Sequence, residues 1–442
     1  MIGMTKRYGF RGLLLTILVI ISIVLSYSIW KGQPNYEAIN VKNVEKTTIS
    51  KEQTAAQTFK PYKVIWNKDG KQFSSNDETA IKSLSSRGTT FGFSEVLVSE
   101  KKKTETYESI IHQNDTFELV YPTTIPFTIF SQVFHVSGKN LQSDSFNRII
   151  FDKNASDTGL HTVYFANDQN HTIYQSSLQE KDMNEVASIV NKAKDTFIEN
   201  DVVIDQNRRL YLSSSPLNID SRKFIISSIK INLFISALFQ DSDSIKNEGN
   251  NYTNGSSIIQ VNPEYKTLEY VNQAQERNRP ELLPKQKQAM MIQDSFNFVN
   301  EHAGWTGNFT FAGYDVNSGS TNFMLDVHNM MVFNPDKMTT ISVAQGQESV
   351  FRYTRPYYMF ESEIYSAKRK VKLESSYSAY QKLIKSKAVD PQNIDAMAPG
   401  YEMKRSNWEN TSSLNRVVEL EPVWMFQYKG TWFSVNDTEG GN

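Results

Sequence analysis

The sequence has 442 residues, a formal net charge of −1 and a 12% share of aromatic residues. The near-neutral charge gives no argument for a nucleic-acid partner, and 26 Phe and 21 Tyr are too many for a disordered stalk. The sequence contains no cysteine, which excludes disulfides, thiolate metal sites and a cysteine nucleophile.

The most distinctive stretch is residues 13–30, which are 18 residues without charge, proline or glycine. About 20 apolar residues are needed to cross a hydrocarbon layer of roughly 30 Å as a helix. Basic residues lie mainly before this stretch: Lys6, Arg7 and Arg11, against Lys31 after it. We therefore predict a single transmembrane helix over 13–30, with residues 1–12 in the cytoplasm and the rest of the chain outside the cell.

A cleaved signal peptide is the alternative interpretation of this stretch. Cleavage would require a small-x-small pattern, whereas residues 27–34 read YSIWKGQP, with bulky side chains. The flanks therefore favour an uncleaved anchor. An outside location together with the lack of cysteine indicates a Gram-positive bacterial surface protein.

One stripe of this helix combines small, hydroxyl and aromatic residues. At 100° per residue it consists of Gly12, Thr16, Val19, Ile23, Ser26 and Trp30, with Ser22 at its edge. Small and hydroxyl residues let helices approach closely and form hydrogen bonds in lipid. The stripe predicts a transmembrane interaction face, although single-span helices also carry a few Ser and Thr residues that face no partner.

The roughly 410 residues beyond the anchor exceed one ordinary core, so two or three domains are expected. We predict a stem over 31–60 and three extracytoplasmic domains, over 61–205, 206–305 and 306–442. The expected fold class is α+β, with mixed domains built mainly on antiparallel sheets. The second and third segments share the same order of elements: strands, a helix and more strands. This order fits a distant duplication, but no repeat of individual residues supports it.

In the first domain, alternation and turn residues predict strands and helices in the following order. A hairpin turn is expected at 67–70 and a break at 121–126. The helices are expected at 77–86 and 182–200, and the strands at 62–66, 91–99, 116–121, 146–151, 162–166 and 172–175.

In the rest of the chain, residues 224–239 indicate a strand that leads into a helix, and further helices are expected at 284–302 and 375–386. Turns are expected at 251–256 and at Lys429-Gly430. The remaining strands are expected at 209–213, 257–261, 267–271, 309–314, 321–327, 330–333, 340–344, 350–358, 417–428 and 431–435.

The sequence offers little catalytic chemistry. Its six histidines lack metal-ligand spacing, and no nucleophile elbow or phosphate-binding glycine loop occurs. Asp241 and Asp243 begin a calcium-like loop, but Lys246 stands where glycine is required and Tyr252 where the closing Glu belongs. A polar turn explains this segment better.

Glu419 and Glu421 alternate along a predicted strand and therefore share one face. Paired carboxylates can perform acid–base chemistry, but an exposed sheet face is the commoner cause. The motifs therefore give no argument for a catalytic site, and we assign no catalytic residues, cofactor or metal site from them. Two alternatives stay open: a binding module for a cell-wall or lipid fragment, and a hydrolase without a recognised motif.

Several stretches together resemble the YycH family, also called WalH. They are SYSIW at 26–30 followed by QPNY at 33–36, ALFQDSD at 237–243 followed by YTNG at 252–255, and LEPVW at 420–424 with Tyr428. The order and spacing of these stretches carry the resemblance, which extends over the full length. In its central turns this chain is rich in Asn, where proteins of the family often carry a basic or small residue.

The resemblance implies a membrane-anchored regulator of the WalK sensor histidine kinase, which controls cell-wall homeostasis with the response regulator WalR in low-GC Gram-positive bacteria. It also implies a single-span partner, YycI, and three α+β domains of which the last two are akin to YycI. Self-association is left open. We hypothesise that the predicted helix packs against the spans of YycI and of the kinase.

Overall fold

The computed structural model describes residues 18–19, 21–22, 52–98, 104–139, 141–205, 208–239, 244–277, 283–406 and 416–438. Residues 47–442 form one compact unit, and residues 1–46 form another. The two units are described separately below.

In the unit 1–46, the described residues Leu18, Val19, Ile21 and Ser22 are helical and exposed. The rest of the predicted transmembrane helix lies outside the described residues. So do five members of its predicted interaction face: Gly12, Thr16, Ile23, Ser26 and Trp30. Among the residues that are described, no helix has both the length and the apolar character needed to cross a membrane.

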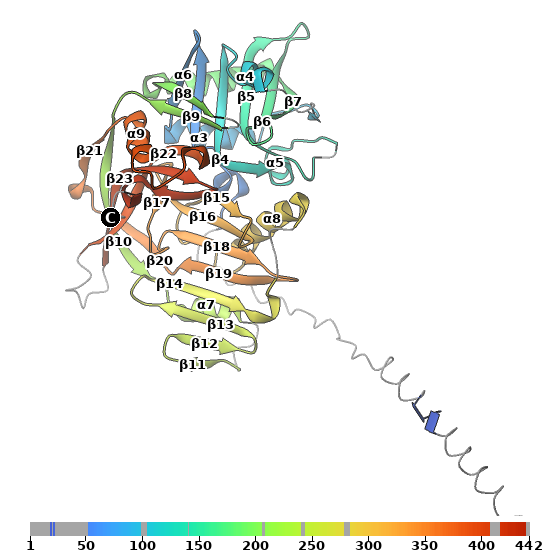
Figure 1. Cartoon of the computed structure of the whole chain (residues 1–442), viewed down its shortest axis with the longest axis vertical. Helices are drawn as coiled ribbons and strands as arrows, with labels where there is room; N and C mark the ends of the chain where they lie inside the picture. The colour runs from blue at the N-terminus through green and yellow to red at the C-terminus, as the bar shows by residue number, and fades with distance from the viewer. Residues whose placement is uncertain are drawn as a thin grey trace, which may run out of the picture. The chain divides into compact units, whose positions relative to one another are not determined.

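The larger unit contains two large sheets, which lie in the upper and lower parts of Figure 1. In the described residues the first sheet has nine strands in the order β3-β7-β6-β5-β4-β1-β2-β8-β9, and all its pairings are antiparallel. Its strands are β1 (Lys63–Lys68), β2 (Lys71–Ser75), β3 (Leu97–Val98), β4 (Thr116–Pro126), β5 (Ser145–Ala155), β6 (Leu160–Asn167), β7 (Thr172–Gln179), β8 (Ile198–Asp205) and β9 (Arg208–Ser213).

Alternation along β1 determines what each face of this sheet buries. Val64 belongs to the main apolar core, which also contains residues of three helices: α3 (Glu78–Gly88), α5 (Phe127–Phe134) and α6 (Glu180–Lys192). Lys63 and Ile65 point to the opposite face. Helix α4 (Thr104–Ile111) covers part of that face through Tyr107 and Ile111.

The first sheet curls, so that its last strand approaches its middle. β9 is five strands from β5 in the sheet order, yet Tyr211 of β9 packs against Ile65 of β1 and Val120 of β4. The sheet therefore encloses a small interior between β4, β5 and β9.

The second sheet has fifteen strands among the described residues, with a main path of β11-β12-β13-β14-β19-β18-β16-β17-β22-β23-β10-β20. Strands β15, β21 and β24 pair with β16, β10 and β23 respectively. The β17–β22 pairing is parallel, and the other pairings of these described strands are antiparallel.

The strands of the second sheet are β10 (Leu217–Ser228), β11 (Lys246–Glu248), β12 (Asn251–Asn254), β13 (Ser257–Asn262), β14 (Thr267–Asn272), β15 (Phe309–Asp315), β16 (Ser320–Val327), β17 (Met330–Phe333), β18 (Thr340–Gln345), β19 (Val350–Pro356), β20 (Tyr358–Glu363), β21 (Arg369–Leu373), β22 (Ile394–Ser406), β23 (Arg416–Tyr428) and β24 (Thr431–Ser434). Its associated helices are α7 (Ile231–Leu238), α8 (Lys285–Glu301) and α9 (Ser376–Lys385). Phe234, Phe296 and Val299 place α7 and α8 in the main apolar core.

The short helix α2 (Ala55–Thr58) joins the two sheets. Gln53, just before it, bonds the backbone of Phe309 through both its side-chain oxygen (2.9 Å) and nitrogen (3.0 Å). The ring of Phe59, just after it, contacts Phe296 edge-on and Phe311 at a tilt. Both sheets therefore share one apolar core.

The mixed α+β class with large antiparallel sheets is confirmed. The predicted hairpins, the helices near 77–86, 284–302 and 375–386, and the strand leading into a helix over 224–239 are also present. The division into three domains stays a prediction. The first sheet continues to Ser213, and strands from both later segments join one sheet.

Several predicted elements were wrong in extent. Residues 121–126 are the second half of β4, although its register with β5 shifts between Val120 and Ile125. The predicted helix 182–200 ends at Lys192, because residues 198–205 pair with β2 and β9 instead. Within the described residues 91–98 only Leu97–Val98 is a strand, and the pattern missed α4, α5, β21 and β22.

Candidate functional site

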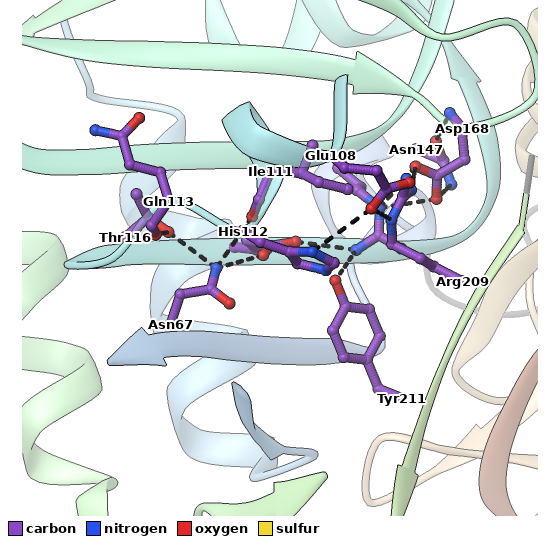
Figure 2. Close-up of polar contacts among 12 residues, drawn as sticks. Asn67, Glu108, Ile111, His112, Gln113, Thr116, Asn147, Asp168, Arg209 and Tyr211 are labelled. Carbon is purple, nitrogen blue, oxygen red and sulfur yellow. Dashed lines mark hydrogen bonds and ion pairs between the residues drawn. The ribbon is translucent and has the colours of Figure 1, made fainter. Parts of the chain in front are cut away.

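A cluster of charged side chains fills the interior that the first sheet encloses (Figure 2). At its centre is Arg148 of β5, which is 1% exposed. Its Nε donates to both carboxylate oxygens of Asp168, at 2.9 and 2.8 Å. Its Nη1 donates to Glu118 Oε2 at 2.9 Å and to the Tyr211 hydroxyl at 3.1 Å. The guanidinium therefore connects β4, β5, β9 and the turn after β6.

Arg209 of β9 approaches the same carboxylate from another side. Its Nη1 lies 2.7 Å from Asp168 Oδ1, and its Nε and Nη2 both bond the carboxylate of Glu108 on α4. Tyr107 and Asn147 add further hydrogen bonds to Asp168, at 2.7 and 3.0 Å. Burial alone would raise the pKa of Asp168, but the two arginines and these donors hold that pKa at about 2.

Glu118 of β4 is the second fully buried acid. Burial raises its pKa, while Arg148 and the side-chain amide of Asn67 act against that shift. The Asn67 amide nitrogen donates to Glu118 Oε1 at 2.5 Å and to the Thr116 hydroxyl at 2.9 Å. Glu118 is thus hydrogen-bonded on both oxygens, as a buried carboxylate must be.

His112 lies beside the cluster, with Nδ1 3.5 Å from Glu108. Burial and then the charge of Arg209 lower its pKa to about 4. The imidazole is therefore neutral at pH 7, and the cluster balances the positive charges of Arg148 and Arg209 without it.

Lys63 of β1 occupies the border of the cluster and is 5% exposed. Its Nζ lies 3.5 Å from each of the carbonyl oxygens of Tyr211 and Met397. Burial, and to a smaller extent the charge of Arg148, lowers its pKa to about 8. Among the described residues no carboxylate forms an ion pair with it.

A cavity of about 440 Å³ opens next to this cluster, between the first sheet and the α8–β15 region. Arg148, Asp168 and Arg209 form part of its wall. Its aromatic lining consists of Tyr62, Tyr121, Tyr211, Phe311 and Tyr314. This size and composition suit a small polar molecule with an apolar part.

Tyr121 adds a second feature to this cavity. Its hydroxyl is buried and has no hydrogen-bond partner in the described residues, and burial raises its pKa. A buried hydroxyl without a partner is costly, so an acceptor or donor from a bound molecule would stabilise it. The cavity wall also carries both Asp144 and Lys285, so it offers groups of either sign.

The pair predicted from alternation, Glu419 and Glu421, shares a face of β23 as expected. Lys223 lies 3.3 Å from the first carboxylate and Arg369 lies 2.6 Å from the second. The pair is therefore part of a charged sheet face. Asp241 and Asp243 lie outside the described residues, and the described residues contain no group of three or more ligand side chains placed to hold a metal.

Reasoning from the sequence missed the buried cluster. Glu118, Arg148, Asp168 and Arg209 are separated by 20 to 41 residues and share no motif. The available signal was weak: Glu118 lies between Phe117 and Leu119, which places a charge inside an apolar strand. Such a charge requires a buried partner.

The structure is thus a two-sheet α+β protein whose first sheet closes around a buried cluster of ion-paired side chains. Residues 8–195 match the family model described as YycH protein, N-terminal domain, and residues 207–439 match YycH protein, C-terminal domain. The chain belongs to the YycH family.

A sequence comparison and a structure comparison, both with YycH of Bacillus subtilis, support this assignment. The chain is 23% identical over 451 residues to the two-component system WalR/WalK regulatory protein YycH of Bacillus subtilis (strain 168), covering 96% of this chain and 95% of that relative. The crystal structure of YycH from Bacillus subtilis matches with a TM-score of 0.73 at 19% identity, over 88% of this chain and 98% of that chain. The structural match establishes the shared fold.

Proposed function

We propose that this protein is a non-enzymatic regulator of a WalR/WalK-type two-component system that controls cell-wall homeostasis. The observation that carries the proposal is the match to both YycH domains, together with a full-length relative named as a WalR/WalK regulatory protein. The state of the charge cluster also supports it, because its two arginines and its carboxylates form ion pairs with one another, which fits a structural role.

The regulator is anchored by residues 13–30, with its N-terminus in the cytoplasm and the compact unit 47–442 outside the cell. Its hydropathy and flanking charges support this topology. The anchor contacts the spans of a YycI-like partner and of the kinase through Gly12, Thr16, Val19, Ser22, Ile23, Ser26 and Trp30. A bias of about 1–3 kcal/mol between kinase states changes their ratio about 5- to 150-fold, so modest lateral contacts are sufficient.

Photo-crosslinking in native membranes tests this arrangement. A crosslinking amino acid at Ser26 faces the proposed partners, whereas one at Val24 lies at a similar depth, about 160° away around the helix at 100° per residue. We expect Ser26 to capture the kinase or the YycI-like protein and Val24 to capture neither. Equal capture from both positions would contradict a specific face.

A second candidate function is a binding module for a cell-wall or lipid fragment, with regulation as its output. The aromatic-lined cavity beside Arg148 and the unpartnered hydroxyl of Tyr121 favour it. Native mass spectrometry of the full chain, released gently from membranes, is the test. A bound small molecule that is lost in Tyr314→Ala would support the module, and an empty wild-type protein would count against it.

A further inference from the structure

A second cavity, of about 170 Å³, lies on the other side of Tyr211, where β1, β2, β8 and β9 meet β10, α9 and β23. Lys63 lines it, together with the buried Ser376 of α9 and Trp424 of β23. The rim includes His328 and the half-buried Met330. The cavity therefore has a buried floor beneath a partly exposed rim.

The polar lining of this cavity contains no Asp or Glu among the described residues. Its hydroxyl groups come from Ser74, Ser75, Thr196, Ser213 and Ser376. Those of Ser74, Thr196 and Ser213 already donate hydrogen bonds within the fold. The Ser376 hydroxyl accepts from the Ser213 backbone N–H, and its own hydrogen can turn toward a ligand. A cation beside such a hydroxyl, without a carboxylate in the lining, is suited to an anion and unsuited to a metal ion.

Lys63 is poorly neutralised within the fold. Its two carbonyl contacts, at 3.5 Å, are at the limit of hydrogen bonding. Glu118, a buried acid of the cluster, already accepts hydrogen bonds from Arg148 and Asn67. A buried ammonium group without an anion is destabilising, so its presence at a cavity indicates a role other than stability.

The rest of the lining is apolar. Leu217 and Ile219 of β10, Met330 of β17 and Trp424 of β23 form one wall. An anion that enters the cavity can place an oxyanion against Lys63 and the Ser376 hydroxyl while burying a short hydrocarbon part against this wall. Phosphate and carboxylate heads share this recognition chemistry.

We propose that this cavity binds the oxyanion head of a small organic molecule, with Lys63 as its counter-ion and the hydroxyl of Ser376 as a hydrogen-bond donor. The apolar wall selects for a short carbon chain on the same molecule. This site is separate from the anchor and does not depend on the proposed function.

The test uses the full chain in detergent micelles at constant ionic strength, with sodium chloride replaced in turn by sodium phosphate, acetate or butyrate. We expect at least one anion to raise the thermal unfolding midpoint of wild type, and butyrate to bind roughly tenfold more tightly than acetate if the apolar wall is used. A phosphate effect without a carboxylate effect identifies the head as phosphate, and the reverse identifies it as carboxylate.

Lys63→Met removes the cation while keeping an apolar side chain of similar length, and we expect it to abolish the shift. Lys71→Met is the matched control, because Lys71 lies on the neighbouring strand β2, is exposed and pairs with Glu199. It should respond as wild type does. Equal shifts in wild type and Lys63→Met would overturn the proposal, as would the absence of any shift in wild type.

A second measurement does not require the variant to fold. In wild-type protein labelled with ¹³C-lysine, the Lys63 side-chain signal reports its protonation directly. Binding of an oxyanion should raise the Lys63 pKa above its value in chloride by a unit or more. An unchanged titration of that signal in saturating phosphate and butyrate would overturn the proposal.

Discussion

The Nε of Arg148 lies 2.9 and 2.8 Å from the two carboxylate oxygens of Asp168, and both side chains are buried in the interior of the first sheet. Asp168 lies in the turn after β6, so the pair connects that turn to β5. Arg209 binds the same carboxylate from β9. These three residues therefore hold the strands of the curled sheet together and form part of the wall of the larger cavity.

Arg148→Met should destabilise the compact unit strongly. It leaves Asp168 and Glu118 buried without their central partner, and breaking a buried ion pair in this way costs about 3–5 kcal/mol. Urea unfolding followed by tryptophan fluorescence measures the change. Arg352→Met is the matched control, since Arg352 pairs with Glu269 on the surface and its side chain is 53% exposed.

The control should change the free energy of unfolding by less than about 1 kcal/mol. A loss of under 1 kcal/mol in Arg148→Met would mean that the cluster does not hold the sheet closed.

His112 should make the fold sensitive to mild acid. Its folded pKa is about 4, below its usual value near 6.5. Between these pH values the unfolded chain binds a proton that the folded chain does not, so stability is lost as the pH falls through this window. The loss amounts to about 2–3 kcal/mol after allowance for the partial exposure of the ring.

Urea unfolding of wild type and His112→Gln at pH 7, 6, 5 and 4 measures this effect. The slope against pH should be smaller in the variant. Parallel profiles in the two proteins would show that His112 is not the group responsible.

Lys63 should make the stability of the fold depend on pH on the alkaline side. Its folded pKa is about 8, against 10.5 for an ordinary lysine. From pH 8 to 10.5 the unfolded chain keeps a proton that the folded chain has lost, so stability from this group rises with pH. The gain is at most about 3 kcal/mol.

A comparison of wild type with Lys63→Met separates the contribution of Lys63 to the pH dependence of stability from the contribution of the tyrosines. The variant is expected to be the more stable protein at pH 7 in chloride, and its advantage should narrow between pH 8 and 10. A stability difference that does not vary with pH would contradict the assignment.

The elements that follow local rules were predictable from sequence. Residues 67–70 and Lys429-Gly430 form hairpin turns because the chain must adopt positive φ there, with values of 52° and 73° at Asp69 and Gly70, and 51° and 80° at Lys429 and Gly430. Helix α8 begins after Pro284 and follows the apolar spacing that predicted it.

The errors came from tertiary pairing. The helical pattern continues to Ile198, but residues 198–205 complete the sheet by pairing with β2, and this pairing outweighs local spacing. The prolines at 122 and 126 suggested a break. Strand β4 nevertheless continues through them, because its register with β5 shifts between Val120 and Ile125. The charge cluster could not be predicted from the sequence, because its members come together only when the sheet curls.

Ser22→Leu combined with Ser26→Leu should weaken co-purification with the kinase and the YycI-like partner, because larger side chains prevent close helix approach. Ile17→Leu combined with Val24→Leu is the control, because at about 100° per residue these two positions lie opposite Ser22 and Ser26 on the helix. Quantitative immunoblotting of complexes extracted in mild detergent is the measurement. Unchanged recovery and signalling in the serine variant would count against the interaction face.

The most direct test of the central claim is kinase-dependent transcription in cells that lack the native protein and carry one of three forms. These are the full chain, residues 47–442 released outside the cell, and residues 47–442 fused to an unrelated membrane span. The account predicts that only the full chain restores normal transcription. Full restoration by the released form would contradict it, and restoration by the unrelated span would show that tethering suffices without the specific helix face.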